Sequence, residues 1–414
     1  MSLSNKVEIA VIGGGVVGVA TALRLQLEGY RVLLIERVHV AAGASFGNAG
    51  TLAPYGVLPI AQPSLPVAIP SLLFSSASPF VINWKRLPRL MPWLLRFLRQ
   101  CSNANFQHNA VALNRILQRV YEGYAPLLEA CPEAASRLSH SGCLYSYASK
   151  AAFTAAEPAI RLRESFGIAQ QRLTGDEVAG LEPVLAGHAT AGLLFPDSSH
   201  MDDPKAFVEA LAKPLYTTAS YLNAAVERVQ PTQEGLILHC SASQQVQADR
   251  VVVCCGAWSQ DLTGQLGDRI PLETERGYHL EFDLDEMPVS RPCCPVESAF
   301  YMTPMAGRLR IAGTVELGSL HDPANARRFD YLEQHARRVL GLQTPVARKW
   351  LGFRPSLPDS LPVIGPATRD SRVIYAFGHQ HLGITLAGAT AALVAACIAG
   401  TAPEWLDDFS AKRF

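Results

Sequence analysis

The chain has 414 residues, of which 49% are hydrophobic and 17% charged, so it can bury two cores and is not a disordered polypeptide. Its 36 basic and 36 acidic side chains cancel, which argues against a nucleic-acid binder. Nine cysteines without a C-x-x-C spacing indicate buried thiols in a reducing compartment, with no disulfide framework and no metal site. The first apolar run leads into a glycine cluster and not into a secretory cleavage site, so we expect a cytoplasmic protein.

The N-terminal segment has the order of a dinucleotide-binding unit. Residues 7–12 predict a short buried strand, and a glycine-rich turn and a helical pattern follow it. In this turn Gly13 permits the tight bend, Gly15 lets backbone amides approach a pyrophosphate, and Gly18 lets the helix lie close to the strand. The phosphates would lie at the positive end of the helix. The alternative is an ordinary tight turn between strand and helix.

An acidic residue supports the nucleotide interpretation. A second strand is predicted over 31–35 and ends at Glu36, eighteen residues beyond Gly18. A carboxylate at this place accepts hydrogen bonds from an adenosine ribose and disfavours a 2'-phosphate. The loop alone does not distinguish FAD from NAD.

Three later segments carry a resemblance to a known family. They are ASFGNAG at 44–50, GFRP at 352–355 followed by Asp359, and GHQHLG at 378–383. Together they resemble the D-amino-acid oxidase superfamily of FAD-dependent oxidoreductases, and are most similar to bacterial D-amino-acid dehydrogenases of the small-subunit type. Members that oxidise glycine, sarcosine or hydroxyproline share the pattern, so the resemblance indicates the chemistry better than the substrate.

The resemblance implies an α/β fold in two interleaved domains. One is a Rossmann-like, glutathione-reductase-like FAD-binding domain, and the other is an α+β substrate domain built on a mixed sheet. The boundaries that we predict are 1–62, 171–270 and 345–414 for the FAD-binding domain, and 63–170 and 271–344 for the substrate domain.

Contacts to FAD are implied in several separate segments. The residues are Gly13, Gly15, Val16, Val17, Gly18, Glu36, Arg37, Ser45, Asn48, Ala49, Gly50, Val226, Gly256, Trp258, Gly378, His379, Leu382, Gly383, Ile384 and Thr385. For Val226 the alternative is a core residue, and for His379, together with His381, it is a surface position at a helix cap. The segment 45–50 contains no histidine or cysteine, so we expect FAD to be bound noncovalently.

An uncharged stretch follows the last of these motifs. Residues 382–400 carry no charge, but their many alanines and glycines favour a buried helix over a membrane span. The start of such a helix offers amide donors and a positive dipole end to a reduced flavin.

Four residues are candidates for catalysis. Arg354 is expected to hold the substrate carboxylate through a bidentate pair, and the alternative is a structural pair with Asp359. The family commonly adds a phenol to this contact, and either Tyr278 or Tyr301 could supply it. His381, or a water molecule, could help the amine lose its proton.

The function implied is FAD-dependent oxidative deamination or dehydrogenation of a D-amino acid or cyclic imino acid, such as D-proline or hydroxy-D-proline. Hydride would pass to flavin N5, and electrons would go on to a quinone or another carrier. One alternative is a glycine or sarcosine oxidase that uses oxygen, and a noncatalytic flavoprotein subunit is another. The oligomeric state stays open.

One region is basic although the whole chain is neutral. No acidic residue occurs between Glu36 and Glu122, whereas eight cations do, and residues 65–99 mix them with tryptophan and leucine. This composition is typical of contact with an anionic membrane surface, which would make the protein peripheral to the cytoplasmic membrane. The alternatives are an apolar lid on the substrate pocket and a subunit interface.

Overall fold

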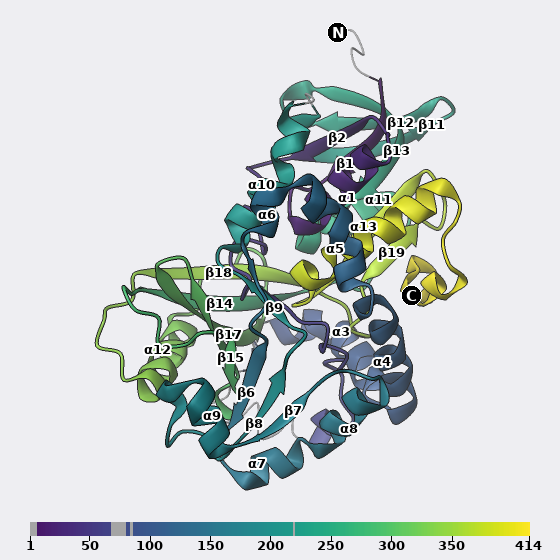
Figure 1. Ribbon diagram of the computed structural model, residues 1–414. Coiled ribbons are helices and arrows are strands. Elements are labelled where there is room, and N and C mark those ends of the chain that lie inside the picture. The colour runs from purple at the N-terminus through teal and green to yellow at the C-terminus, as the bar shows by residue number, and fades with distance from the viewer. Residues whose placement is uncertain (1–5, 68–79, 83–85, 218–219) are drawn as a thin grey trace.

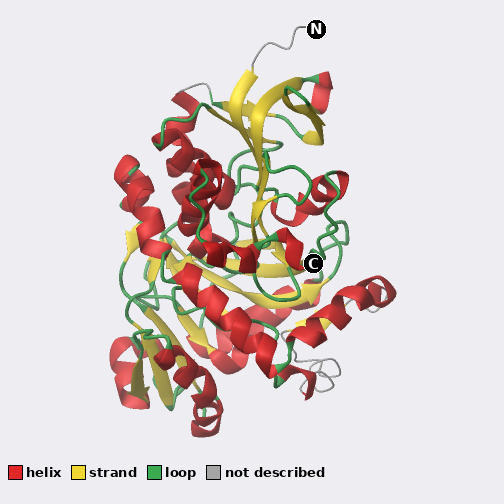
Figure 2. Cartoon of the chain, turned by 90° about the vertical axis from the view of Figure 1, so that its right-hand side faces the viewer, coloured by secondary structure: helices red, strands yellow, loops and turns green. Residues whose placement is uncertain are grey.

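The computed structural model describes residues 6–67, 80–82, 86–217 and 220–414. Two large sheets dominate the molecule, one near the N-terminus and one beneath it (Figure 1). The side view in Figure 2 shows helices along the outside of both. This α/β architecture confirms the predicted fold class.

The first sheet has eight strands. Its parallel part runs in the order β10-β2-β1-β13, with β20 beside the end of β13, and its antiparallel part adds β12, β11 and β19. The central strands are almost wholly apolar because helices or further strands cover both faces. The strands are β1 (Lys6–Ile12), β2 (Val32–Glu36), β10 (Tyr221–Asn223), β11 (Val226–Thr232), β12 (Gly235–Cys240), β13 (Gln245–Val253), β19 (Val363–Pro366) and β20 (Val373–Phe377).

Four helices cover one face of this sheet, namely α1 (Val16–Leu27), α5 (Val120–Ala130), α10 (Pro204–Thr217) and α13 (Gly383–Ala399). The helices α5 and α13 cross closely, because a Cβ on Gly123 would lie 2.4 Å from the Ala389 nitrogen and one on Gly388 would lie 2.6 Å from the Tyr124 nitrogen. The prediction that 382–400 forms a buried, closely packed helix is therefore confirmed. In the described part of the chain, no helix is long and apolar enough to cross a membrane.

The second sheet is mixed, as predicted, and has nine strands. Its order is β18-β14-β17-β16-β15-β6-β8-β7, and β4 pairs with β17. The pairs β15–β6 and β4–β17 are parallel, whereas the others are antiparallel. The strands are β4 (Phe80–Ile82), β6 (Cys143–Tyr147), β7 (Gln171–Thr174), β8 (Ala191–Phe195), β14 (Glu273–Asp283), β15 (Cys293–Pro295), β16 (Phe300–Met305), β17 (Arg308–Leu317) and β18 (Arg348–Ser356).

A three-stranded sheet, β3-β9-β5, supplements the two large ones. The helices α4 and α5 follow one another in the chain and meet at residues 118–119. The remaining elements are β3 (Thr51–Leu52), β5 (Leu138–Ser139), β9 (Ser199–Met201), α3 (Leu87–Gln100), α4 (Asn103–Leu117), α6 (Pro132–Ala135), α7 (Lys150–Ala155), α8 (Glu157–Ser165), α9 (Gly175–Leu181), α11 (Ser259–Gln265), α12 (Ala326–Leu340) and the 3-10 turns η2 (Pro183–Leu185), η3 (Ser241–Ser243), η4 (Gly256–Trp258), η5 (Val296–Ser298), η6 (Glu404–Phe409) and η7 (Ala411–Arg413).

The sheets cross two of the boundaries that we predicted. The strands β7 and β8 lie in the predicted FAD-binding piece 171–270, and β18 lies in the piece 345–414, yet all three belong to the second sheet. Strand β7 begins at residue 171 itself, so a boundary there separates β7 and β8 from β6, which pairs with β8. The division into two domains remains a prediction, with these three strands assigned to the substrate side.

Candidate active site

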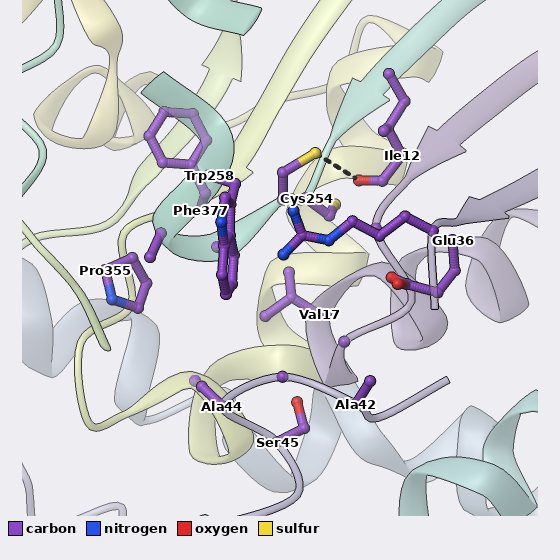
Figure 3. A pocket seen from close by; sticks show the side chains of 18 of the residues that line it. Ile12, Val17, Glu36, Ala42, Ala44, Ser45, Cys254, Trp258, Pro355 and Phe377 are labelled. Carbon is purple, nitrogen blue, oxygen red and sulfur yellow. Dashed lines mark hydrogen bonds between the residues drawn. The ribbon is translucent and has the colours of Figure 1, made fainter. Parts of the chain in front are cut away.

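A long cavity of about 370 Å³ opens where the first sheet meets α1 and α13. It lies at the carboxyl ends of parallel strands, which is where open α/β sheets bind ligands. Figure 3 shows Glu36 and Pro355 at opposite ends of this cavity, with Trp258 between them. Its elongated form fits a dinucleotide.

The glycine loop forms one wall of this cavity. Gly13 has φ +109°, and a Cβ there would lie 2.5 Å from the Cys254 carbonyl oxygen. A Cβ on Gly18 would lie 1.8 Å from the Gly13 carbonyl oxygen, so only glycine lets α1 approach the loop this closely. Gly15 is the N-cap of α1 and lines the cavity, which directs the free amides of the helix start into it.

The Glu36 carboxylate lies at one end of the cavity, where the sequence predicted a ribose contact. It accepts hydrogen bonds from the Gly14 nitrogen at 2.6 Å and the Val38 nitrogen at 2.9 Å. These bonds fix the carboxylate and leave lone pairs for a ribose hydroxyl. Beside it the Arg37 guanidinium lies 4.1 Å from the centre of the Trp258 ring.

Residues 44–50 form a loop that contacts both the start of α1 and the second sheet. The Ser45 hydroxyl accepts a hydrogen bond from the Val16 nitrogen at 2.9 Å, which joins this loop to the start of α1. The Asn48 side chain accepts one from the Gly50 nitrogen at 2.8 Å. From β17, Arg310 donates to the Phe46 carbonyl at 3.1 Å and to the Asn48 carbonyl at 2.6 Å.

Arg310 is itself held by a buried carboxylate. Its guanidinium contacts Glu281 at 2.7 and 2.9 Å, and both side chains are at most 3% exposed. Next to this pair the His279 Nδ1 donates a hydrogen bond to the Gly47 carbonyl at 3.2 Å, and its ring stacks on Trp350. Burial, and then the charge of Arg310, lower the pKa of His279 to about 3, so the ring is neutral. The second sheet thus holds the backbone of the loop 44–50.

The loop before α13 closes the cavity on the other side. Gly383 and Ile384, at the start of α13, line it. The His379 ring lies 2.9 Å from the Thr390 hydroxyl, and burial lowers its pKa to about 3. His379 is therefore a neutral residue fixed against α13, unlike the surface position weighed in the sequence analysis.

A second cavity, also of about 370 Å³, adjoins the first. Ala44, Asn48 and Gln380 line both cavities, so the two meet at these residues. Its walls come from the second sheet, from the segment 49–60 and from the loop before α13. All four candidate catalytic residues line it: Tyr278, Tyr301, Arg354 and His381.

The Arg354 side chain extends across Gly277 of β14, at the wall of this cavity. A Cβ on Gly277 would lie 2.5 Å from its central carbon, so this glycine provides the room for the side chain. One Nη donates to the Thr314 carbonyl at 3.3 Å, and within the described residues no ion pair includes Arg354. Asp359 pairs instead with Arg413 at 2.7 Å. The structural pair that we weighed for Arg354 is therefore absent.

The two tyrosines differ in the direction of their hydroxyls. Tyr278 donates to Glu316 and accepts from the Asn325 nitrogen at 3.2 Å, and its ring packs against Phe329 of α12. The Tyr301 hydroxyl lies 2.5 Å from that of Tyr145. Tyr278 is thus turned toward α12, whereas Tyr301 lies within a group of phenols at the cavity wall.

His381 has an exposed ring that borders the second cavity. The surrounding protein, and then the positive charge of Arg354, lower its pKa to about 4. The imidazole is neutral at pH 7 and has a free lone pair on one nitrogen. It is, however, a weak base.

Most of the predicted FAD contacts line the first cavity. These are Gly13, Gly15, Val16, Val17, Glu36, Arg37, Ser45, Asn48, Val226, Gly256, Trp258, Gly378, His379, Gly383 and Ile384. Ala49, Leu382 and Thr385 line the second cavity instead, while Gly18 and Gly50 line neither.

Several lining residues were not anticipated. Gln380 stands between the cavities with φ +50°, and Thr314 has φ +58° beside Arg354. Positive φ is uncommon outside glycine and often marks functional sites, but no sequence pattern reveals it here. Glu275 was also missed, although its alternation with Gly277 along β14 places both on the face that borders the cavity.

The fold and the two adjoining cavities fit a flavin-dependent oxidoreductase, and comparison with known proteins gives the family. Residues 8–397 match the family of FAD dependent oxidoreductases called DAO, and the chain belongs to this family. The chain is 33% identical to the D-amino-acid oxidase of Bradyrhizobium diazoefficiens, over 98% of both chains. It is 29% identical to D-amino acid dehydrogenase 2 of Ralstonia nicotianae, over 96% of this chain and 97% of that protein.

Solved structures agree on the fold. Glycine oxidase from Geobacillus kaustophilus matches with a TM-score of 0.76 at 21% identity, over 99% of this chain and 100% of that one. L-Proline dehydrogenase from P. horikoshii matches with the same TM-score at 17% identity, over 99% and 98%. The resemblance found in the sequence and the prediction of FAD are confirmed.

The residues present fit FAD. Gly15, the N-cap of α1, adds no side chain to the cavity that it lines, so the helix start is open to a pyrophosphate. Gly13 keeps the loop tight, because a Cβ there would lie 2.5 Å from the Cys254 carbonyl oxygen. Bound FAD supplies a two-electron acceptor at its flavin ring. The chain supplies the positioning, the electrostatics and the exclusion of water.

Proposed function

We propose that this protein oxidises the carbon–nitrogen bond of a small D-amino acid or cyclic imino acid, such as D-proline or hydroxy-D-proline. The observation that carries the proposal is Arg354, whose guanidinium lines the second cavity without an ion pair among the described residues. A guanidinium in such a chamber binds a carboxylate through two parallel hydrogen bonds. The names of the two relatives, a D-amino-acid oxidase and a D-amino acid dehydrogenase, support the same substrate class.

The remaining wall of the cavity supports a small substrate. Ala53, Ile60 and Ala299 line it together with Tyr55 and Tyr301. These residues form a mainly apolar surface with two phenols, which suits a short aliphatic side chain or a pyrrolidine ring. We propose that Tyr301, and not Tyr278, completes the carboxylate contact. The Tyr278 hydroxyl is held by Glu316 and Asn325 on the side of α12, whereas the Tyr301 hydroxyl pairs with that of Tyr145 within the group of phenols at the cavity wall.

The test is anaerobic reduction of the FAD-loaded protein. The panel contains D-alanine, D-proline, hydroxy-D-proline, glycine, sarcosine and the corresponding L-enantiomers, and the bleaching of flavin absorbance is followed. We expect D-amino or imino acids to bleach the flavin fastest. Bleaching by glycine or sarcosine alone, or by no amino acid, would contradict the proposal. Acid precipitation should release all of the FAD, since we propose that it is bound noncovalently.

We also propose that electrons leave to a carrier at an anionic membrane surface, with α3 as the contact. Arg86 and Arg115 are neutralised by Asp322 and Asp408, so the basic region is less cationic than its sequence indicates. The exposed surface of α3 still combines cations with apolar side chains. It carries Arg89, Met91, Leu95, Arg96, Leu98 and Arg99. Residues 68–79 and 83–85, which belong to the same predicted contact, lie outside the described part of the chain.

The location of α3 supports this proposal. Its buried face, formed by Leu90, Trp93 and Phe97, packs with Ala61 and Leu317. Ile60 packs against the same cluster and lines the second cavity. A carrier that met the membrane face of α3 would therefore be close to the substrate cavity. Cations interleaved with apolar side chains match an anionic lipid surface.

Sedimentation with vesicles tests the membrane contact. The triple change of Arg89, Arg96 and Arg99 to glutamine, and separately Leu95→Gln, should reduce binding to vesicles that contain anionic lipid. The matched controls are Arg327→Gln and Arg338→Gln on the exposed face of α12, and Leu27→Gln, whose side chain is 47% exposed on α1. Equal loss in controls and variants, or no binding by the unchanged protein, would contradict the contact.

A further inference from the structure

The second cavity contains one acidic side chain that the proposed function does not use. Glu275 lies on β14 directly opposite Arg354 on β18, so the two side chains project from the same face of the sheet. Both line the cavity, and Glu275 is only 5% exposed. Among the described residues, neither side chain takes part in an ion pair.

Few of the side chains that line this cavity are charged or titratable. Arg354 and Glu275 are its charged side chains, and the other titratable groups that line it are His381, Tyr55, Tyr278 and Tyr301. His381 is a neutral, weak base, and burial raises the pKa of each of the three phenols. Among the described residues that line the cavity, Glu275 is therefore the one side chain that offers an anionic proton acceptor.

We propose that Glu275 accepts the ammonium proton of the bound amino acid. The inference rests on the proposed function, because it takes Arg354 as the residue that holds the substrate carboxylate. In an amino acid the nitrogen is attached to the carbon next to that carboxylate, so it must lie close to the Arg354 head group. Opposed residues on paired strands have Cβ atoms about 4.5–5.5 Å apart, which puts the Glu275 carboxyl within reach of the same substrate.

The proton transfer conserves charge within the cavity. A zwitterion enters between a carboxylate and a guanidinium, and the proton moves from the substrate nitrogen to a carboxylate oxygen of Glu275. The electron pair of the broken N–H bond stays on nitrogen as its lone pair. The net charge is unchanged, so the step avoids burying an uncompensated ion.

The transfer of a hydride from the substrate then follows. The Cα–H bond breaks and its electron pair passes with the hydrogen to oxidised FAD, while the nitrogen lone pair forms the C=N bond. When the iminium product leaves, Glu275 returns its proton to water. Burial raises the pKa of the Glu275 carboxyl, and the charge of Arg354 opposes this rise, which brings the group closer to the range useful for a base.

A kinetic test compares unchanged protein with Glu275→Gln. Anaerobic flavin reduction is measured from pH 6 to pH 10 with the best substrate of the panel, as the ratio of limiting rate to dissociation constant. Without the carboxylate only the free amine is productive, so the ratio should fall about tenfold for each pH unit below the pKa of the substrate ammonium. It should return to within about twofold of the unchanged protein at high pH. Glu275→Asp should keep the flatter profile.

A binding test needs no turnover. The probe is 2-aminoisobutyrate, which has no α-hydrogen and is not oxidised, and its binding is measured by calorimetry at pH 8 in two buffers of different ionisation enthalpy. The unchanged protein should bind it without net proton release, whereas Glu275→Gln should release about one proton per molecule bound. The control variant Glu209→Gln, which changes a surface carboxylate of α10, should behave as the unchanged protein does in this proton count.

The outcomes separate the two proposals. If no amino acid reduces the flavin of the unchanged protein, the proposed function fails. If reduction proceeds but Glu275→Gln lowers the rate equally at every pH, or leaves it unchanged, Glu275 is not the acceptor. Release of a proton by the unchanged protein on binding the probe would likewise overturn the assignment.

Discussion

The two cavities of this molecule are built in different ways. The first is formed largely by backbone and glycine, and two of its key contacts, Gly13 and Gly15, lie within a single strand–turn–helix unit. The second is formed by side chains from strands that are far apart in the sequence, such as Arg354 and Tyr301. The first cavity therefore depends on local shape, and the second on how the sheet aligns distant residues.

The strongest test of this difference is Arg354→Lys. Lysine keeps the charge but not the fork, and the geometry over Gly277 is specific to a planar group. We expect catalytic efficiency to fall by about 2–4 kcal/mol of transition-state stabilisation, which is roughly 30- to 1,000-fold, while FAD stays bound. The measurement is steady-state kcat/KM with the flavin content as reference. Arg372→Lys, which changes a surface pair with Asp370, is the control, and an equal effect there would contradict the assignment.

The cofactor cavity is tested by Gly18→Ala. The new methyl group would lie 1.8 Å from the Gly13 carbonyl oxygen, so α1 or the loop must move. We expect about 1–3 kcal/mol of destabilisation and a protein that is purified with little FAD. Gly180→Ala is the control, because no atom lies within 4 Å of that position. Full flavin content and an unchanged melting temperature in Gly18→Ala would show that the close packing is not needed.

The variant Arg310→Lys tests how the second sheet supports the loop 44–50, whose residues Ala44 and Asn48 line both cavities. This change removes the Nη1 group that donates to both the Phe46 and the Asn48 carbonyl, and hydrogen bonds to charged groups contribute about 1.5–3 kcal/mol each. We expect weaker FAD binding and a shifted flavin spectrum, because the loop 44–50 loses its support. Arg348→Lys is the matched control, since Arg348 also contacts Glu281 but is half exposed and does not contact the loop. Identical FAD affinities in the two variants would contradict this role.

The smallest expected effect distinguishes the two tyrosines. Tyr301→Phe should raise KM by roughly twofold to tenfold, which corresponds to one hydrogen bond of about 0.5–1.5 kcal/mol. Tyr278→Phe should instead lower the melting temperature, because its hydroxyl bonds to Glu316 and Asn325 next to α12. The reverse result would assign the substrate contact to Tyr278.

The sequence predicted the first cavity well because its signals are local. Gly13, Gly18 and Glu36 lie where the spacing of strand, turn and helix places them, and the resemblance to the family supplied FAD. It also located Arg354 through a short motif. Nothing in the spacing showed that Tyr278 turns toward α12, since both tyrosines lie in alternating strands and the direction depends on Glu316.

Other features depend on contacts between distant segments. The strand β18 joins the second sheet by pairing with β14, about seventy residues earlier, so a boundary drawn at 345 from the chain order could not anticipate it. In the same way the partners of Arg86 and Arg115, namely Asp322 and Asp408, are remote in sequence. The segment between Glu36 and Glu122, which contains no acidic residue, therefore predicted more positive charge than the folded surface has.

The central claim is that the flavin and the Arg354 guanidinium border one chamber. It is tested most directly by titrating the FAD-loaded protein with a short carboxylate that lacks an amine, such as propionate, and recording the visible flavin spectrum. The account predicts a saturable spectral shift in the unchanged protein and its loss in Arg354→Lys at equal flavin content. A shift of equal size and affinity in both proteins would contradict it.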